Sequence, residues 1–198
     1  MGRKIFTKKL ILETAFDLLK TQGVDCFSAR NLAKQLSCSV QPLYSEFDNM
    51  EELEDALFER LFFYFRNKIC LLRRVDEDSK NLDPLITMGL NYLDFAKNEF
   101  KLYQAIYFRK FAKRHLMKEH LKDVFDRLVL PTSKYKKLSE KETNKLFSGM
   151  WLFLAGLAYL LSNEIIYLTQ AQQIDFLERV IQAILQDNFS LDLSILFG

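Results

Sequence analysis

The segment from Ser39 to Phe47, with the sequence SVQPLYSEF, carries three side chains suited to hydrogen bonding with a large polar partner. Ser39 can donate to a phosphate oxygen, and Gln41 can form a pair of hydrogen bonds with an adenine edge. The Tyr44 hydroxyl can also reach a phosphate. Gln41 can equally be an ordinary surface residue, and Tyr44 and Phe47 can serve packing alone. The pattern therefore predicts nucleic-acid contact while leaving a structural role open.

Two short helices must position these side chains. Residues 29–36 form a good helix with Ser28 as its cap, and Ala33 is small where two crossing helices come closest. The residues Ser37 and Cys38 allow a sharp turn, and Leu43 supplies the apolar face of the second helix. This arrangement predicts a helix-turn-helix, in which the second helix lies in the major groove of DNA.

The second helix contains Pro42, which has no backbone N–H. Proline is tolerated in the first turn, where N–H groups have no intrahelical partner. We expect Ser39 to cap this helix by accepting the N–H of Gln41, and Phe47 to anchor its end in the core. The surrounding domain, rather than helix propensity, then holds the segment in place.

The composition of the chain indicates an all-α fold. Its 198 residues are 49% hydrophobic but include only 6 Gly and 3 Pro, too few for the turns of a β-rich or α/β protein. We predict about nine helices. A domain of residues 1–49 carries the helix-turn-helix, a helix from about residue 50 connects, and residues 50–198 form a second helical domain. The predicted helices span roughly residues 7–23, 29–36, 39–47, 48–74, 84–98, 99–112, 117–130, 140–162 and 171–187.

The residues that could support catalysis or bind metal are sparse. The sequence has no Gly-rich phosphate loop, nucleophile elbow or metal-ligand cluster. His115 and His120 are five residues apart, so they do not share a helix face, and a surface role fits them better than metal binding. Cys26, Cys38 and Cys70 are odd in number and lack C-x-x-C spacing. This pattern is typical of buried thiols in a reducing cytosol. We therefore predict a protein that is not an enzyme and has no cofactor.

The charge and hydropathy patterns bear on possible partners. The net charge of +2 is too small to indicate nucleic-acid binding by itself, and the basic residues Arg3, Lys4, Lys8 and Lys9 fit either a solvated helix end or a phosphate-seeking arm. The most apolar run, residues 146–161, is shorter than the roughly 20 residues that cross a bilayer. We interpret it as a fully buried helix. With no signal peptide in the sequence, we predict a cytoplasmic protein without a membrane partner.

The first sixty residues resemble the DNA-binding domain of the tetracycline-repressor (TetR) family. The matching stretches are ILETAFDLLKTQG, SARNLAKQLSCSVQPLYSEF and NMEEL. Together they contain a first helix ending in Gly, a capped second helix with Leu-Ala, a Leu-Tyr-x-x-Phe third helix and an acidic start to the fourth. The remaining residues resemble the family only in architecture.

The resemblance implies a two-domain homodimer that represses transcription and releases DNA when a small molecule enters the C-terminal domain. The resemblance adds Ser28 and Arg30, at the start of the second helix, to the candidate DNA-binding residues on the third helix. Two departures from the family pattern should weaken the electrostatic attraction to DNA phosphates. Glu46 stands where the family usually has His, and Met50 stands where it often has Lys. Backbone N–H groups near Met50 can still receive a phosphate. The candidate DNA-binding residues are Ser28, Arg30, Ser39, Val40, Gln41, Pro42, Tyr44 and Met50.

The C-terminal half is rich in aromatic residues, and some of them could line a pocket for a hydrophobic or aromatic effector. Most must simply be core, so the selected ligand-binding candidates are guesses: Tyr92, Tyr103, Tyr107 and Trp151. The last two helices resemble the dimer-forming pair of the family, and a monomeric core with the same pattern is the alternative. In the dimer interpretation, one face of the last helix forms the contact: Ile174, Leu177, Val180, Ile181 and Ile184.

The sequence thus predicts a DNA-binding transcriptional regulator, a ligand-released dimeric repressor that binds a palindromic operator. The alternative is a dimeric adaptor that keeps the helix-turn-helix fold but binds a protein instead of DNA. Low net charge, Glu46 and Met50 favour this alternative. The sequence does not identify the effector, the operator, the regulated genes or the sign of regulation.

Overall fold

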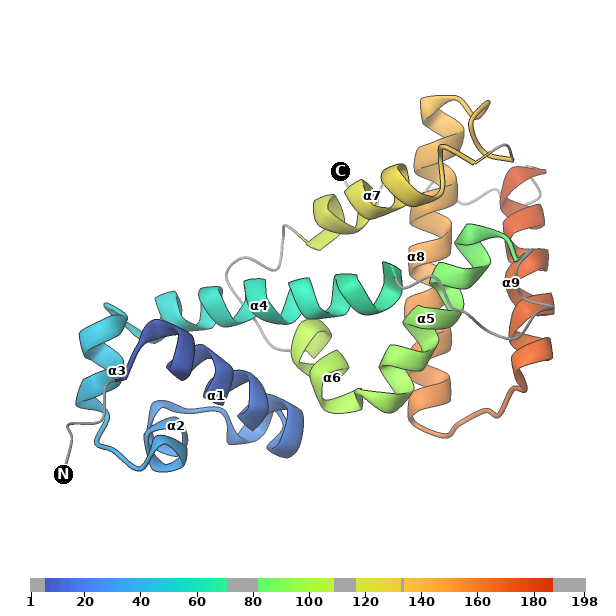
Figure 1. Ribbon diagram of the computed structural model, residues 1–198. Helices are drawn as coiled ribbons and strands as arrows, with labels where there is room; N and C mark the ends of the chain where they lie inside the picture. The colour runs from blue at the N-terminus through green and yellow to red at the C-terminus, as the bar shows by residue number, and fades with distance from the viewer. Residues whose placement is uncertain (1–5, 71–81, 109–116, 133, 187–198) are drawn as a thin grey trace. The chain divides into compact units, whose positions relative to one another are not determined.

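The computed structural model describes residues 6–70, 82–108, 117–132 and 134–186, and the regular structure in these ranges is helical (Figure 1). The all-α prediction is confirmed. The predicted helix ends at residues 74, 112 and 187 lie outside the described residues. The elements are α1 (Lys8–Gln22), η1 (Val24–Cys26, a 3-10 turn), α2 (Ala29–Leu36), α3 (Gln41–Glu46), α4 (Met50–Cys70), α5 (Pro84–Asn98), α6 (Phe100–Phe108), α7 (Met117–Leu128), α8 (Glu140–Ser162) and α9 (Gln170–Leu185).

The chain forms two compact units that are interleaved in sequence. The N-terminal unit contains Met1–Phe65 and Glu99–Lys118, and the C-terminal unit contains Arg66–Asn98 and Glu119–Gly198. Helix α4 therefore begins in one unit and ends in the other, and α6 packs with the N-terminal unit although it follows α5 in sequence. The boundary expected near residue 50 on functional grounds stays a prediction.

Helix α1 begins and ends where the sequence predicts. The Thr7 hydroxyl accepts the N–H of Leu10 at 3.2 Å, and the N–H of Gly23 donates to the carbonyl of Leu19 at 2.9 Å. Gly23 has a φ of 88°, a backbone conformation that favours glycine. The buried face of α1 forms the centre of the N-terminal unit and consists of Ile11, Ala15, Phe16, Leu18 and Leu19.

Helix α6 is attached to α1 by polar contacts as well as by its apolar face. Lys20 Nζ lies 3.0 Å from Glu99 Oε1, and the Tyr64 hydroxyl donates to the same oxygen at 2.8 Å. The hydrogen bond from Lys20 to Glu99 raises the pKa of the Lys20 ammonium, against the smaller opposing effect of desolvation. Lys101 Nζ donates to the Thr21 carbonyl at the C-terminus of α1, where a cation is favoured. The buried residues of α6 are Leu102, Tyr103, Ala105 and Ile106.

The C-terminal unit is built around α5, which contacts both α8 and α9. Gly89 allows the close approach, because a Cβ there would lie 3.1 Å from Leu177 Cδ1. Asp83 fixes the start of α5: its carboxylate accepts the N–H of Leu85 at 2.9 Å and the hydroxyl of Tyr135 at 2.6 Å. Lys134 Nζ pairs with the same carboxylate at 2.6 Å. The loop before α8 is thereby tied to α5.

Helix α8 starts with a reciprocal cap, in which Ser139 accepts the N–H of Glu142 and Glu142 accepts the N–H of Ser139. The helix is long and apolar enough to cross a membrane by length and composition alone, a property shared with core helices of soluble proteins. The expectation of full burial is wrong. Leu152 and Tyr159 are 46% and 48% exposed, because the helices that contact α8 leave these residues uncovered.

The face of α9 expected to contact a second subunit is largely covered within the chain. Leu177, Ile181 and Ile184 are buried, and Leu177 lies against Gly89 of α5. The apolar periodicity of α9 therefore reflects packing inside the C-terminal unit. The exposed aromatic residue of α9 is Phe176, whose ring stacks on Phe153 of α8 at 5.9 Å.

Candidate functional site

The turn between α2 and α3 is shaped by a left-handed serine. Ser37 has φ 56° and ψ 48°, and the N–H groups of Ser37 and Cys38 donate to the carbonyls of Lys34 and Ala33. These bonds end α2 after two turns and send the chain sharply into α3. The Ser28 hydroxyl accepts the N–H of Asn31 at 3.3 Å and so caps α2 as predicted. A hydroxyl keeps its own hydrogen in this role, so Ser28 can still donate to a phosphate.

Helix α3 separates a buried side from an exposed side. Leu43 and Phe47 are 1% and 3% exposed, whereas Ser39 and Gln41 are exposed and Tyr44 is 47% exposed. The predicted capping by Ser39 is wrong, because the backbone is already helical at Val40, whose carbonyl accepts the N–H of Leu43 at 3.1 Å. The Ser39 hydroxyl thus lies outside the helix start. The remaining candidates are exposed at Arg30 and Val40 and half-buried at Pro42 and Met50.

Glu46, the residue that departs from the TetR pattern, is used within the protein. Its carboxylate accepts the backbone N–H of Lys8 at the start of α1, at 3.2 Å. Lys8 Nζ pairs with Glu52 Oε1 at 2.9 Å and lies 5.0 Å from the centre of the Phe47 ring. These contacts connect α1, the end of α3 and the start of α4. We therefore regard Glu46 and Lys8 as residues that position α3.

The same contacts set the charge state of this corner. The hydrogen bond with Glu52 raises the pKa of the Lys8 ammonium, and the hydrogen bond with Lys8 lowers the pKa of the Glu52 carboxyl. The second largest effect on Glu52 is the N–H of Asp48, which donates to Oε2 at 2.7 Å. Lys8 is thus already paired with a carboxylate. Arg3 and Lys4 lie outside the described residues.

The start of α4 is capped by side chains. Asn49 Oδ1 accepts the N–H of Glu52 at 2.9 Å, and the Glu52 carboxylate accepts the N–H of Asp48 at 2.7 Å. The expected phosphate site next to Met50 must therefore share this helix end with the Glu52 carboxylate. A phosphate would meet like charge there.

A pocket lies within the C-terminal unit, between the last turns of α4 and the helices α5, α7 and α8. The space that it encloses is small, about 30 Å³. The rings of Phe125 and Phe147 meet edge to face at 5.6 Å, and Trp151 follows Phe147 at 6.0 Å. Among the described residues, the lining contains Ile69, Met88, Tyr92, Leu121, Phe125, Phe147, Met150, Trp151 and Leu154.

The four guessed ligand-binding residues fall into two separate places. Tyr92 and Trp151 line the pocket. Tyr103 and Tyr107 are on α6 in the N-terminal unit, where their rings lie 4.7 Å apart, and they are not among the lining residues. The other lining residues were missed, because an aliphatic residue that lines a pocket has the same sequence signal as one in the core.

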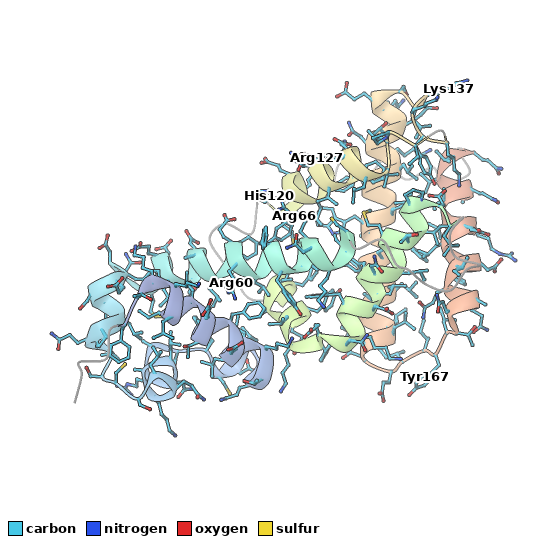
Figure 2. The ribbon with its side chains drawn as sticks, viewed as in Figure 1. Arg60, Arg66, His120, Arg127, Lys137 and Tyr167 are labelled. Carbon is cyan, nitrogen blue, oxygen red and sulfur yellow. The ribbon has the colours of Figure 1, made fainter. Side chains whose placement is uncertain are left out.

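The histidines and thiols form no recognisable metal site in the described part of the chain. His120 is on α7 (Figure 2), and His115 lies outside the described residues. Within the described ranges, no three His, Cys, Asp or Glu side chains cluster in a way that could hold a metal ion. Cys26, Cys38 and Cys70 are free thiols that are half-buried rather than buried as predicted.

No protein-family model matches the chain. The chain is 26% identical over 118 residues to the biofilm operon icaADBC HTH-type negative transcriptional regulator IcaR of Staphylococcus epidermidis. The match covers 59% of this chain and 62% of the relative, which is less than two thirds of its length.

Two solved structures are similar over nearly the whole chain. The fatty acid degradation regulator FadR from Bacillus halodurans has a TM-score of 0.60 at 15% identity, covering 93% of this chain and 97% of that one. The TetR family protein ActR of Streptomyces coelicolor, in complex with (S)-DNPA, has a TM-score of 0.55 at 15% identity, covering 93% and 100%. These similarities establish that the chain has the TetR-family fold, as the sequence resemblance predicts.

Proposed function

We propose that this chain, with the fold of the TetR-family regulators, is a DNA-binding transcriptional regulator. In this proposal it is a dimeric repressor that binds a palindromic operator and is released by a small ligand. The observation that carries the proposal is the two-sided α3, which buries Leu43 and exposes Ser39, Gln41 and Tyr44. The exposed polar side of the second helix in a helix-turn-helix is suited to the major groove of DNA.

Selection of bound sites from a random DNA pool tests this proposal and gives the operator. Arg30→Ala should weaken binding to the selected site. Tyr44→Phe should weaken it by about 1 kcal/mol, roughly fivefold, through one lost hydrogen bond. Tyr167→Phe is the matched control, because Tyr167 projects from the loop between α8 and α9 and is 78% exposed (Figure 2). Absence of salt-sensitive retention on any DNA would contradict the proposal.

The proposed dimer uses the outer face of α8 and α9, defined by Leu152, Gly156, Tyr159 and Phe176. The first three residues follow helical spacing, and all four are exposed. A Cβ at Gly156 would meet nothing within 4 Å in the protomer, so Gly156→Arg should fold normally but block a second copy. Sedimentation velocity should show a dimer for the wild type and a monomer for this variant. A wild-type monomer would contradict the dimer, and the operator should show two half-sites about one helical turn, or a multiple of it, apart.

The proposed effector site is the pocket of the C-terminal unit, with Tyr92 and Trp151 as contact residues. A pocket with this lining is suited to a small hydrophobic or aromatic molecule. A cytoplasmic location belongs to the same proposal, because the operator DNA of a bacterial-type regulator is there.

A second candidate function is supported by the acidic corner of the N-terminal unit. Glu52 pairs with the Lys8 ammonium, and the Glu46 carboxylate accepts the backbone N–H of Lys8, so this corner offers phosphates little positive charge. An adaptor that binds a protein through the same surface would show no salt-dependent DNA retention. Its behaviour on DNA would be unchanged by Arg30→Ala and Tyr44→Phe, which separates the two functions.

A further inference from the structure

We infer that Val40, the residue directly before α3, determines specificity by covering the C5-methyl group of a pyrimidine in the major groove. In the neighbouring base pair, the side-chain amide of Gln41 pairs with an adenine. These two contacts give the proposed regulator its base preference, and they rest on the proposal that α3 binds DNA.

Val40 stands at a helix start where a polar side chain is more stabilising. At the equivalent position of α1, α2, α8 and α9, a Ser or Thr hydroxyl accepts a backbone N–H. The side chain of Val40 makes no cap hydrogen bond. Valine is among the residues least favoured at this position, because it offers the free N–H groups no acceptor. Helix stability therefore does not explain the valine.

Burial does not explain the valine either. Val40 is 37% exposed, whereas Leu43 and Phe47, which seat α3 in the core, are 1% and 3% exposed. Tyr44 follows Val40 by one helical turn and is 47% exposed, so the two side chains share the exposed side of α3. Because β-branching restricts the side-chain torsion of valine, Val40 presents its two methyl groups in a restricted orientation. They lie on the side of α3 that is proposed to face DNA.

An aliphatic side chain has one apolar partner among the base edges of the major groove, the C5-methyl group of thymine. The other groups at these edges donate or accept hydrogen bonds, and covering them with a methyl group leaves them desolvated and unpaired. Val40 should therefore favour a base pair that carries a C5-methyl group. In unmodified DNA, the base with this group is thymine.

Gln41 adds the second base. It is exposed, and among the described residues its side-chain amide has no hydrogen-bond partner. The Ser45 hydroxyl donates to the main-chain carbonyl of Gln41 at 3.1 Å and leaves the amide free. The free amide can accept from N6 of an adenine and donate to its N7. Consecutive Cα atoms are about 3.8 Å apart and stacked base pairs about 3.4 Å apart, so Val40 and Gln41 can contact neighbouring base pairs.

Pyrimidine analogues in the selected operator isolate the methyl contact. At each thymine next to an adenine, thymine and uracil differ only by the C5-methyl group, and so do 5-methylcytosine and cytosine. At one such position, the wild type should bind the methylated member of each pair about fourfold more tightly, the effect of burying one methyl group. Fluorescence anisotropy of the labelled duplexes measures these affinities. Equal affinity within either pair at every such position, or a half-site without a thymine next to an adenine, would overturn the inference.

Val40→Ser separates recognition from helix stability. Serine is a favourable capping residue without methyl groups, so this variant should unfold at an equal or higher temperature and yet lose the fourfold methyl effect. Ser45→Ala, on the same helix, is the matched control and should keep the methyl effect, because the Ser45 hydroxyl is bonded to the main chain. Retention of the methyl effect by Val40→Ser would overturn the inference, whatever the stability of the variant.

The analogue 7-deazaadenine tests the neighbouring contact. It lacks N7 but keeps Watson–Crick pairing, so replacing the adenine with it should weaken wild-type binding at least about fivefold. Gln41→Ala should remove this penalty and leave the methyl effect. Gln182→Ala, the same change at an exposed position of α9, should alter neither. Persistence of the penalty in Gln41→Ala would assign the adenine to another residue and overturn the inference.

Failure of these base contacts is distinguishable from failure of the proposed function. Salt-dependent DNA binding in which Val40→Ser still prefers thymine to uracil leaves the regulator intact and overturns the base contacts. Absence of salt-dependent binding to any DNA overturns both.

Discussion

The two units of the molecule place their candidate functional residues in opposite environments. In the N-terminal unit, Gln41 and Tyr44 are exposed, and a different set of residues, including Leu43 and Phe47, is buried beneath them. In the C-terminal unit, the pocket is lined by side chains that also form the core, such as Phe125, which is fully buried.

This difference determines how function and stability are related in each unit. Residues that contact a partner from an exposed helix can change without disturbing the fold, because surface substitutions usually alter stability little. Residues that line an internal pocket serve both purposes, so most changes alter both. Substitutions are therefore expected to change stability most in the C-terminal unit and least on the exposed side of α3.

The largest effect is expected for Phe125→Ala, which removes a buried ring from the pocket wall. The free energy of unfolding should fall by about 3–5 kcal/mol. Any quenching of Trp151 fluorescence by the uncharged dye N-phenyl-1-naphthylamine should be lost with it. Denaturant titration and Trp151 fluorescence measure the two effects. If either changed without the other, function and stability would be separable in the C-terminal unit, contrary to the contrast.

The next effect concerns Tyr135, a buried residue outside the pocket. Desolvation by burial, followed by the hydrogen bond to Asp83, raises the pKa of the Tyr135 phenol well above its usual range. A raised pKa in the folded state means that this stabilisation is complete below about pH 10, the usual tyrosine pKa, and is lost as the pH rises further. Tyr135→Phe should lower the free energy of unfolding at pH 7 by about 1.5–3 kcal/mol, because it removes a hydrogen bond to a carboxylate.

The alkaline limb provides the control for this prediction. The wild type should lose stability above about pH 10, and Tyr135→Phe should flatten that slope, whereas the exposed Tyr167→Phe should not. An unchanged slope would show that Tyr135 does not couple the loop before α8 to the start of α5.

A smaller effect is expected at the start of α4 in the N-terminal unit. Asn49→Ala removes the side-chain oxygen that accepts the N–H of Glu52 and should cost about 1 kcal/mol of stability. Asn144→Ala, at an exposed position inside α8, should be neutral or slightly stabilising. Thermal unfolding compares the two. Equal destabilisation by both changes would argue against a capping role.

The smallest effect on stability is expected for Tyr44→Ala, a substitution on the exposed side of α3. Tyr44→Ala should change the free energy of unfolding by less than about 0.5 kcal/mol while weakening DNA binding more than Tyr44→Phe does. Denaturant titration and a DNA-binding isotherm on one preparation provide the comparison. A large loss of stability would show that the ring is part of the packing and not a group displayed for DNA.

The helix-turn-helix could be predicted from sequence because its signals are local. Thr7, Ser28 and Asn49 cap helices through residues three positions away, and these spacings are visible in the sequence. The predicted cap at Ser39 differs from the structure by one residue, because whether Ser39 or Val40 precedes the helix depends on backbone angles that the sequence does not specify.

The parts that escaped prediction depend on contacts between distant residues. Glu46 accepts the N–H of Lys8, 38 positions away, and no local pattern marks that pair. The described lining residues of the pocket come from four helices, and the inward face of α9 has the same periodicity as a face that would meet a second subunit. Periodicity shows that a face is covered but not what covers it.

The interleaving of the two units has a consequence for how such a protein can be divided. The N-terminal unit is complete only with α6, whose Leu102 and Ile106 are buried and whose Lys101 caps the end of α1. Any fragment cut after α4 would lack this helix and expose apolar surface of α1 and η1, which α6 contacts. A single recombination breakpoint after α4 would therefore separate the two segments of the N-terminal unit. A chimaera of two such proteins needs Met1–Phe65 and Glu99–Lys118 from the same parent.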